Sequence, residues 1–185
     1  MSESHVETLK RNVQCLKDRL AIQDCIARHA RGHDRHDSAL LTSTYWEDGF
    51  DEHGNVLNAG PGYAEWGNAK HASESCLHTH NISCHTCEIE GDIAHCESYV
   101  IVALLDRDEA TSRFISGRYI DRLERRNGEW RIALRRSVVD TVIAGDASML
   151  KNPAFKEMGY PKGTWDKTDI SYERPLKLET SAKKW

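Results

Sequence analysis

The feature that most constrains the fold is a change of hydrophobic period part-way along the chain. Up to residue 72 the apolar residues recur at the three- and four-residue spacing of helices, and from residue 78 onward they follow the alternation of strands. Helices followed by a run of antiparallel strands predict an α+β fold, with the helices packed on one sheet. We therefore expect a single layered domain.

The first part of the chain predicts three helices. The longest spans residues 6–33 and carries two apolar stripes at helical spacing. The first stripe consists of Val6, Leu9, Val13, Leu16 and Leu20. The second stripe lies on a rotated face and consists of Ile22, Ile26, His29 and His33. Shorter helices are expected over residues 38–45, with Asp37 as N-cap, and over residues 61–72, with Pro61 in the first turn.

Strands dominate the second part of the chain. Four are expected, over residues 78–90, 94–105, 112–126 and 130–143. Asn127-Gly128 between the last two is a strong hairpin signal, because both central residues of a type I′ turn need positive φ. A shorter hairpin is expected over residues 47–58, with its turn at Gly54-Asn55. These elements predict a domain over residues 1–145. Prolines and glycines interrupt residues 146–185, which we expect to form an irregular tail that packs on the domain or on a neighbouring subunit.

The charge of the chain argues against nucleic acid as its main partner. The formal net charge is −4, and the arginines of residues 122–136 alternate with acidic residues, which indicates a solvated hairpin face. No apolar run approaches the roughly 20 residues that span a bilayer. The first 14 residues are polar and lack an apolar signal segment. We therefore expect a cytoplasmic protein with no membrane partner.

The cysteines do not predict a metal site. The chain has six, of which Cys84 and Cys87 form a C-x-x-C spacing. A zinc site needs a second pair of ligands, and only His95-Cys96 is available, where adjacent residues make poor joint ligands. We expect reduced, buried thiols, no metal and no organic cofactor.

Two residues far apart in the sequence are candidates for acid/base chemistry. Asp34 follows Ala27 and Ala30 at helical spacing, which points its carboxylate to the interior side of the long helix. His78 and His80 alternate on a predicted strand and share one face. An aspartate that accepts a hydrogen bond from one ring nitrogen fixes the tautomer and leaves the other nitrogen as a base. The alternatives to an acid/base pair are an aspartate that only ends the helix and two histidines on a solvent-exposed strand face.

Several segments together resemble the SnoaL-like proteins of the NTF2-like superfamily. They occur in order and with similar spacing: Leu20-Ala21-Ile22-Gln23-Asp24, Arg31-Gly32-His33-Asp34-Arg35-His36-Asp37, Leu77-His78-Thr79-His80, Glu90-Gly91-Asp92-Ile93-Ala94-His95, Gly117-Arg118-Tyr119-Ile120-Asp121 and the hairpin around Asn127-Gly128. The resemblance implies an NTF2-like cone, in which a curved antiparallel sheet and N-terminal helices enclose a pocket. It points to the branch that contains scytalone dehydratase and hexachlorocyclohexane dehydrochlorinase.

The resemblance also implies roles for individual residues. Asp34 and His80 fall on the catalytic aspartate and histidine of that branch. His29 stands where the dehydrochlorinase has a lysine, Arg135 where it has an arginine, and His53 near a tyrosine of the dehydratase. A histidine in place of a lysine weakens the case for a halide leaving group, because its charge depends on pH.

The changed positions predict a polar pocket. Asp51 replaces a large apolar residue of the dehydrochlorinase, which favours an oxygenated substrate. The predicted substrate-binding residues are His29, His53, Arg135, Tyr45 and Asp51. The function that the resemblance implies is a cofactor-independent lyase. It would carry out dehydratase-like β-elimination on a small cyclic or aromatic oxygenated substrate, as a homodimer or homotrimer.

Other functions remain open at this point. The same fold supports ketosteroid-isomerase- or cyclase-like proton transfer, for which Tyr99 and Asp140 are loose candidates. It also supports non-catalytic binding or dimerisation modules and the small subunits of ring-hydroxylating oxygenases. A metal enzyme using His78, His80 and His85 is disfavoured, because His85 has the opposite strand parity to the other two.

Overall fold

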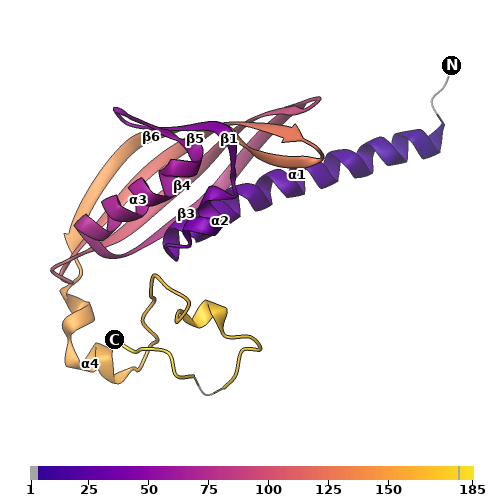
Figure 1. Ribbon diagram of the computed structural model, residues 1–185. Coiled ribbons are helices and arrows are strands. Elements are labelled where there is room, and N and C mark those ends of the chain that lie inside the picture. Colours follow the sequence, from indigo (N-terminus) through magenta and orange to yellow (C-terminus); the bar gives the residue numbers. More distant parts are fainter. Residues whose placement is uncertain (1–3, 179) are drawn as a thin grey trace.

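The computed structural model describes residues 4–178 and 180–185. A mixed, curved sheet is covered on one face by helices (Figure 1). The helices are α1 (His5–Asp34), α2 (Ser38–Thr42), α3 (Gly60–Glu74) and α4 (Pro153–Glu157), with 3₁₀ turns η1 (Ser148–Lys151) and η2 (Ile170–Tyr172). The strands are β1 (Tyr45–His53), β2 (Val56–Ala59), β3 (Ser75–Glu90), β4 (Ile93–Asp106), β5 (Thr111–Arg126) and β6 (Glu129–Asp146). This is the predicted α+β, NTF2-like cone.

The sheet has the order β2-β1-β6-β5-β4-β3. The three long hairpins from β3 to β6 are antiparallel as predicted, and Asn127 and Gly128 have the positive φ values of 54° and 83° that a type I′ turn needs. The pairing of β1 with β6 is parallel, which the sequence pattern did not predict.

The helix expected over residues 38–45 is shorter than predicted. It ends at Thr42, and the carbonyl of Thr44 already accepts a hydrogen bond from the Ile132 amide at 2.8 Å. The chain has therefore joined the sheet edge before Tyr45, which belongs to β1.

The two stripes of α1 have different environments. Ile22, Ile26, His29 and His33 of the second stripe are at most 2% exposed, and they pack onto the sheet. The N-terminal part of α1, which carries most of the first stripe, projects beyond the sheet (Figure 1), and the five residues of the stripe are 42–65% exposed. Periodicity identified the helix correctly, but among the described residues this stripe has no apolar partner that covers it.

A β-bulge in β3 changes which side chains face the helices. The register with β4 shifts between Ile82 and His85, so that His85 lies half-buried and Cys87 is buried, on the same side as His78 and His80. The prediction that His85 faces away from His78 and His80 was therefore wrong.

The tail after β6 is largely irregular and contacts the C-terminal end of α1. Asp169, which is 3% exposed, forms an ion pair with Arg35 at 3.1 Å. The ring of Trp165 stacks on His36 with centroids 4.1 Å apart, and Lys167 pairs with Asp37. Within the described residues, no helix has the length and apolar character needed to cross a membrane.

Candidate active site

Asp34 and His80 meet where the last turn of α1 crosses β3. Asp34 is the final residue of the helix, and its Oδ1 lies 2.7 Å from His80 Nδ1. The same carboxylate accepts the backbone N–H of His80 at 2.9 and 3.1 Å. The His80 side chain is 3% exposed and that of Asp34 is 15% exposed. Because Nδ1 donates to the carboxylate, Nε2 is the nitrogen left with a free lone pair.

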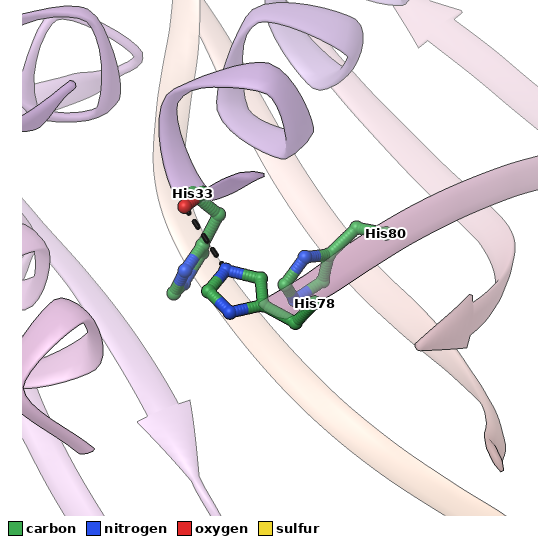
Figure 2. A group of neighbouring side chains, drawn as sticks. All are labelled: His33, His78 and His80. Atoms are coloured by element: carbon green, nitrogen blue, oxygen red, sulfur yellow. Dashed lines mark hydrogen bonds between the residues drawn. The ribbon is translucent and has the colours of Figure 1, made fainter. Parts of the chain in front are cut away.

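His80 is surrounded by other imidazoles. Its ring stacks on His33 with centroids 4.7 Å apart, and the rings of His78 and His71 lie at 5.4 and 5.5 Å. Figure 2 shows His33 reaching down from α1 toward His78 and His80 on β3, with His78 Nε2 bonded to the backbone carbonyl of His33 at 3.0 Å. The imidazole side chains therefore pack between the C-terminal end of α1 and strand β3.

Burial decides the charge of these neighbours. Desolvation lowers the pKa of His33 well below 6.5, and the nearby His80 lowers it further. Desolvation likewise lowers the pKa of His71 and that of His78 to about 3, with neighbouring imidazoles as the next cause. These three rings are neutral at pH 7. Of the four clustered imidazoles, His80 is the one whose ring is bonded to a carboxylate.

The dyad borders a small groove between α1 and β3. This groove of about 290 Å³ is lined by Ala27, Ala30, Arg31, Asp34, Arg35, His80 and Ile82. An adjoining groove of about 240 Å³ shares Ala27 and Ile82 with it. The dyad end is charged and the far end more apolar, an arrangement that fits a small molecule with a polar head.

Four of the predicted substrate-binding residues form a buried network behind the dyad. Arg135 makes two 2.7 Å contacts with Asp121 and donates to His29 Nδ1 at 2.8 Å. His29 Nε2 then bonds to the Tyr45 hydroxyl at 3.1 Å, and that hydroxyl donates to Asp51 at 2.7 Å. These residues fill the interior of the cone and do not line the groove. Their substrate-binding role stays a prediction.

The fifth predicted residue, His53, lies at the margin of this network. Its side chain is 38% exposed, with Nδ1 3.5 Å from Asp51 Oδ1 and 3.2 Å from the Ser137 hydroxyl. It does not line the groove at the dyad either.

Three residues of the site were given no role from the sequence, namely His33, Tyr63 and Asp121. His33 stacks on the dyad histidine, and its Nε2 bonds to the hydroxyl of Tyr63 at 2.8 Å. Asp121 is the counter-ion of Arg135, although the alternating charges predicted a solvated hairpin face. The signal for His33 was its place in the second stripe of α1, whose other members are core residues.

The candidates for an isomerase pair lie elsewhere. Tyr99 is 47% exposed on the outer face of the sheet, and Asp140 pairs with Arg118 on that face. Among the residues that the structure describes, two groups of side chains have the geometry to hold a metal ion. The first is His33, His78 and His80, and the second is His85, Cys87 and Cys96.

Comparison with known proteins assigns the family. The family model of the SnoaL-like domain matches residues 14–136. The chain belongs to the SnoaL-like family. No curated protein matches this SnoaL-like chain.

Solved structures share its fold. Rv3472 from Mycobacterium tuberculosis, a protein of unknown function, is 29% identical over 68% of this chain and 77% of its own, with a TM-score of 0.61. A type 2 hexachlorocyclohexane dehydrochlorinase (LinA) is 21% identical over 72% of this chain and 93% of its own, with a TM-score of 0.68. A proposed scytalone dehydratase from Novosphingobium aromaticivorans is 16% identical over 71% and 90%, with a TM-score of 0.65.

Proposed function

We propose that this SnoaL-like protein is a cofactor-independent lyase that catalyses β-elimination, with His80 as general base and Asp34 as its partner. The observation that carries the proposal is the 2.7 Å contact between His80 Nδ1 and the Asp34 carboxylate at the edge of a groove. A base held in one tautomer by a carboxylate contributes about 10²- to 10⁴-fold to a proton transfer. The fold shared with a dehydrochlorinase supports the same chemistry.

The reaction would proceed by one proton transfer and one bond cleavage. His80 Nε2 takes a proton from the carbon next to an activating carbonyl, and the electron pair of that C–H bond forms the new double bond. The C–O bond on the neighbouring carbon breaks, and the departing hydroxide takes the proton from the imidazolium and leaves as water. Asp34 stabilises the imidazolium between these events. Arg31, which lines the same groove, is the cation best placed to bind the polar head of the substrate.

The proposed substrate class follows from the size and lining of the groove. The two adjoining spaces of about 290 and 240 Å³ suit one or two rings. Ile26, Ala27 and Ile82 provide an apolar wall for the ring, and the dyad provides the polar end. We therefore propose a small cyclic or aromatic oxygenated substrate.

We also propose that copies of the chain associate through the outer face of the sheet. Tyr99, Ile101, Phe114 and Ile120 share that face and are 38–47% exposed. Contiguous exposed apolar side chains are characteristic of protein interfaces. Analytical ultracentrifugation tests this association: wild-type protein should sediment as a dimer or trimer and Ile101→Glu as a monomer. A monomeric wild-type protein would contradict it.

The experiment that tests the enzymatic proposal compares His80→Gln with wild type on a panel of cyclic β-hydroxy ketones in the presence of EDTA. Formation of the conjugated enone is followed by its ultraviolet absorbance. The exposed His95 on the outer face provides the matched control, His95→Gln. We expect elimination by wild type and the control, and loss of about 10²-fold or more in His80→Gln. Equal rates in all three proteins would refute the role of His80.

A further inference from the structure

The three histidines of Figure 2 have the geometry of a metal site. His33 comes from the last turn of α1, and His78 and His80 come from alternate positions of β3. One ring nitrogen of each lies within 4.8 Å of one ring nitrogen of both others. All three side chains are at most 8% exposed, so that water does not compete freely for these nitrogens.

In each ring, one nitrogen is already held by an oxygen atom. His80 Nδ1 bonds to Asp34 at 2.7 Å, His78 Nε2 to the His33 carbonyl at 3.0 Å, and His33 Nε2 to the Tyr63 hydroxyl at 2.8 Å. Histidines that ligate metals almost always have their other nitrogen bound to a carboxylate, a carbonyl or another oxygen, which fixes the tautomer and the ring orientation.

The opposite nitrogens are available. Nδ1 of His33 and Nδ1 of His78 are buried and form no hydrogen bond with any of the described residues. A buried polar atom without a partner costs about 1–3 kcal/mol. The contact of His80 Nδ1 with Asp34 leaves its Nε2 as the third donor. A cation bound by the three rings would give both of these unpartnered nitrogens a partner.

We propose that His33, His78 and His80 bind one divalent transition-metal ion, and that the bound ion silences the lyase by occupying Nε2 of His80. Three neutral imidazoles without a carboxylate ligand suit Zn²⁺, Co²⁺ or Ni²⁺ and not Mg²⁺ or Ca²⁺. The fourth coordination position is left for a water molecule. The proposed inhibition by the bound ion rests on the proposed lyase function, whereas the proposed metal site does not.

The test measures binding of Co²⁺ and Zn²⁺ by equilibrium dialysis and isothermal titration, without substrate. A Cys96→Ser background disables the second candidate group, in which Cys87 and Cys96 have their sulfur atoms 3.2 Å apart. We expect one ion per chain in this background, and a Kd raised about 100-fold or more when His78→Gln is added. His95→Gln is the matched control and should leave the Kd unchanged. His78→Phe, which keeps the ring volume, repeats the test if His78→Gln does not unfold cooperatively.

Two results would overturn the metal site. One is loss of binding in the Cys96→Ser background, with thiolate-to-cobalt absorption in the wild-type protein identifying the cysteines as the ligands instead. The other is an unchanged Kd in both His78 variants. If the protein catalysed elimination at the full rate in saturating Zn²⁺, the proposed inhibition of the lyase by the bound ion would be refuted. Metal binding by a protein that eliminates nothing in EDTA would refute the proposed lyase and still support the metal site.

Discussion

Acidification should destabilise the protein well before its carboxylates titrate. Burial lowers the pKa of His29 and His33 well below 6.5 and that of His71 and His78 to about 3. On unfolding, each ring regains a pKa near 6.5. The unfolded state therefore binds more protons than the folded state below pH 6.5, and the free energy of unfolding falls as the pH falls.

The size of the stability loss on acidification follows from the linkage between proton binding and unfolding. Lowering the pH from 7.5 to 5.5 costs about 1.4 kcal/mol for each ring that stays neutral in the folded state, or about 5–6 kcal/mol for these four. Typical domains have only about 5–15 kcal/mol of stability, so the loss is large. The loss begins near pH 6.5 and continues toward the folded-state values, which for His78 means about pH 3.

Urea denaturation at half-unit pH intervals measures this dependence. His78→Gln removes one of the titrating rings and should lessen the loss by about 1.4 kcal/mol. The exposed His95 provides the control, since His95→Gln should keep the full dependence. A free energy of unfolding that differs by less than about 1 kcal/mol between pH 7.5 and 5.5 would refute the assignment of these rings as neutral.

Three further perturbations test the packing. Asp121→Asn leaves a buried arginine without its carboxylate and should cost about 3–5 kcal/mol in chemical denaturation, whereas an unchanged midpoint would contradict the buried ion pair. Gly117→Ala would place a Cβ 2.1 Å from a backbone oxygen of β6 and should cost about 1–3 kcal/mol, whereas Gly145→Ala meets nothing within 4 Å and should be neutral. Trp165→Ala removes the ring stacked on His36 and should speed proteolysis of the tail without shifting the melting temperature of the domain; equal cleavage rates would show that the stacking does not hold the tail.

Much of the fold could be predicted from local patterns. The period change located the helices and the long strands, and Asn127-Gly128 located the last hairpin, because local backbone preferences determine these features. The parallel pairing of β1 with β6 was not predictable, because it depends on contacts between segments about 80 residues apart.

The candidate site could be predicted only in part. The partnership of Asp34 with His80 came from family resemblance, since spacing alone gave two candidates with no evidence of contact. The parity of His85 could not be read through a bulge, which flips the side chains that follow it. Asp121 appeared as one charge among many, because a sequence does not reveal which member of an alternating charged segment is buried.

The most direct measurement of the central claim is exchange of the α-proton of a substrate ketone in D₂O, followed by NMR for wild type and Asp34→Asn. Asparagine keeps an oxygen that accepts the His80 N–H groups but removes the negative charge that stabilises the imidazolium. We expect an exchange rate lower by about 10²- to 10⁴-fold in Asp34→Asn, with cooperative unfolding retained. Exchange by Asp34→Asn at the wild-type rate would contradict the central claim.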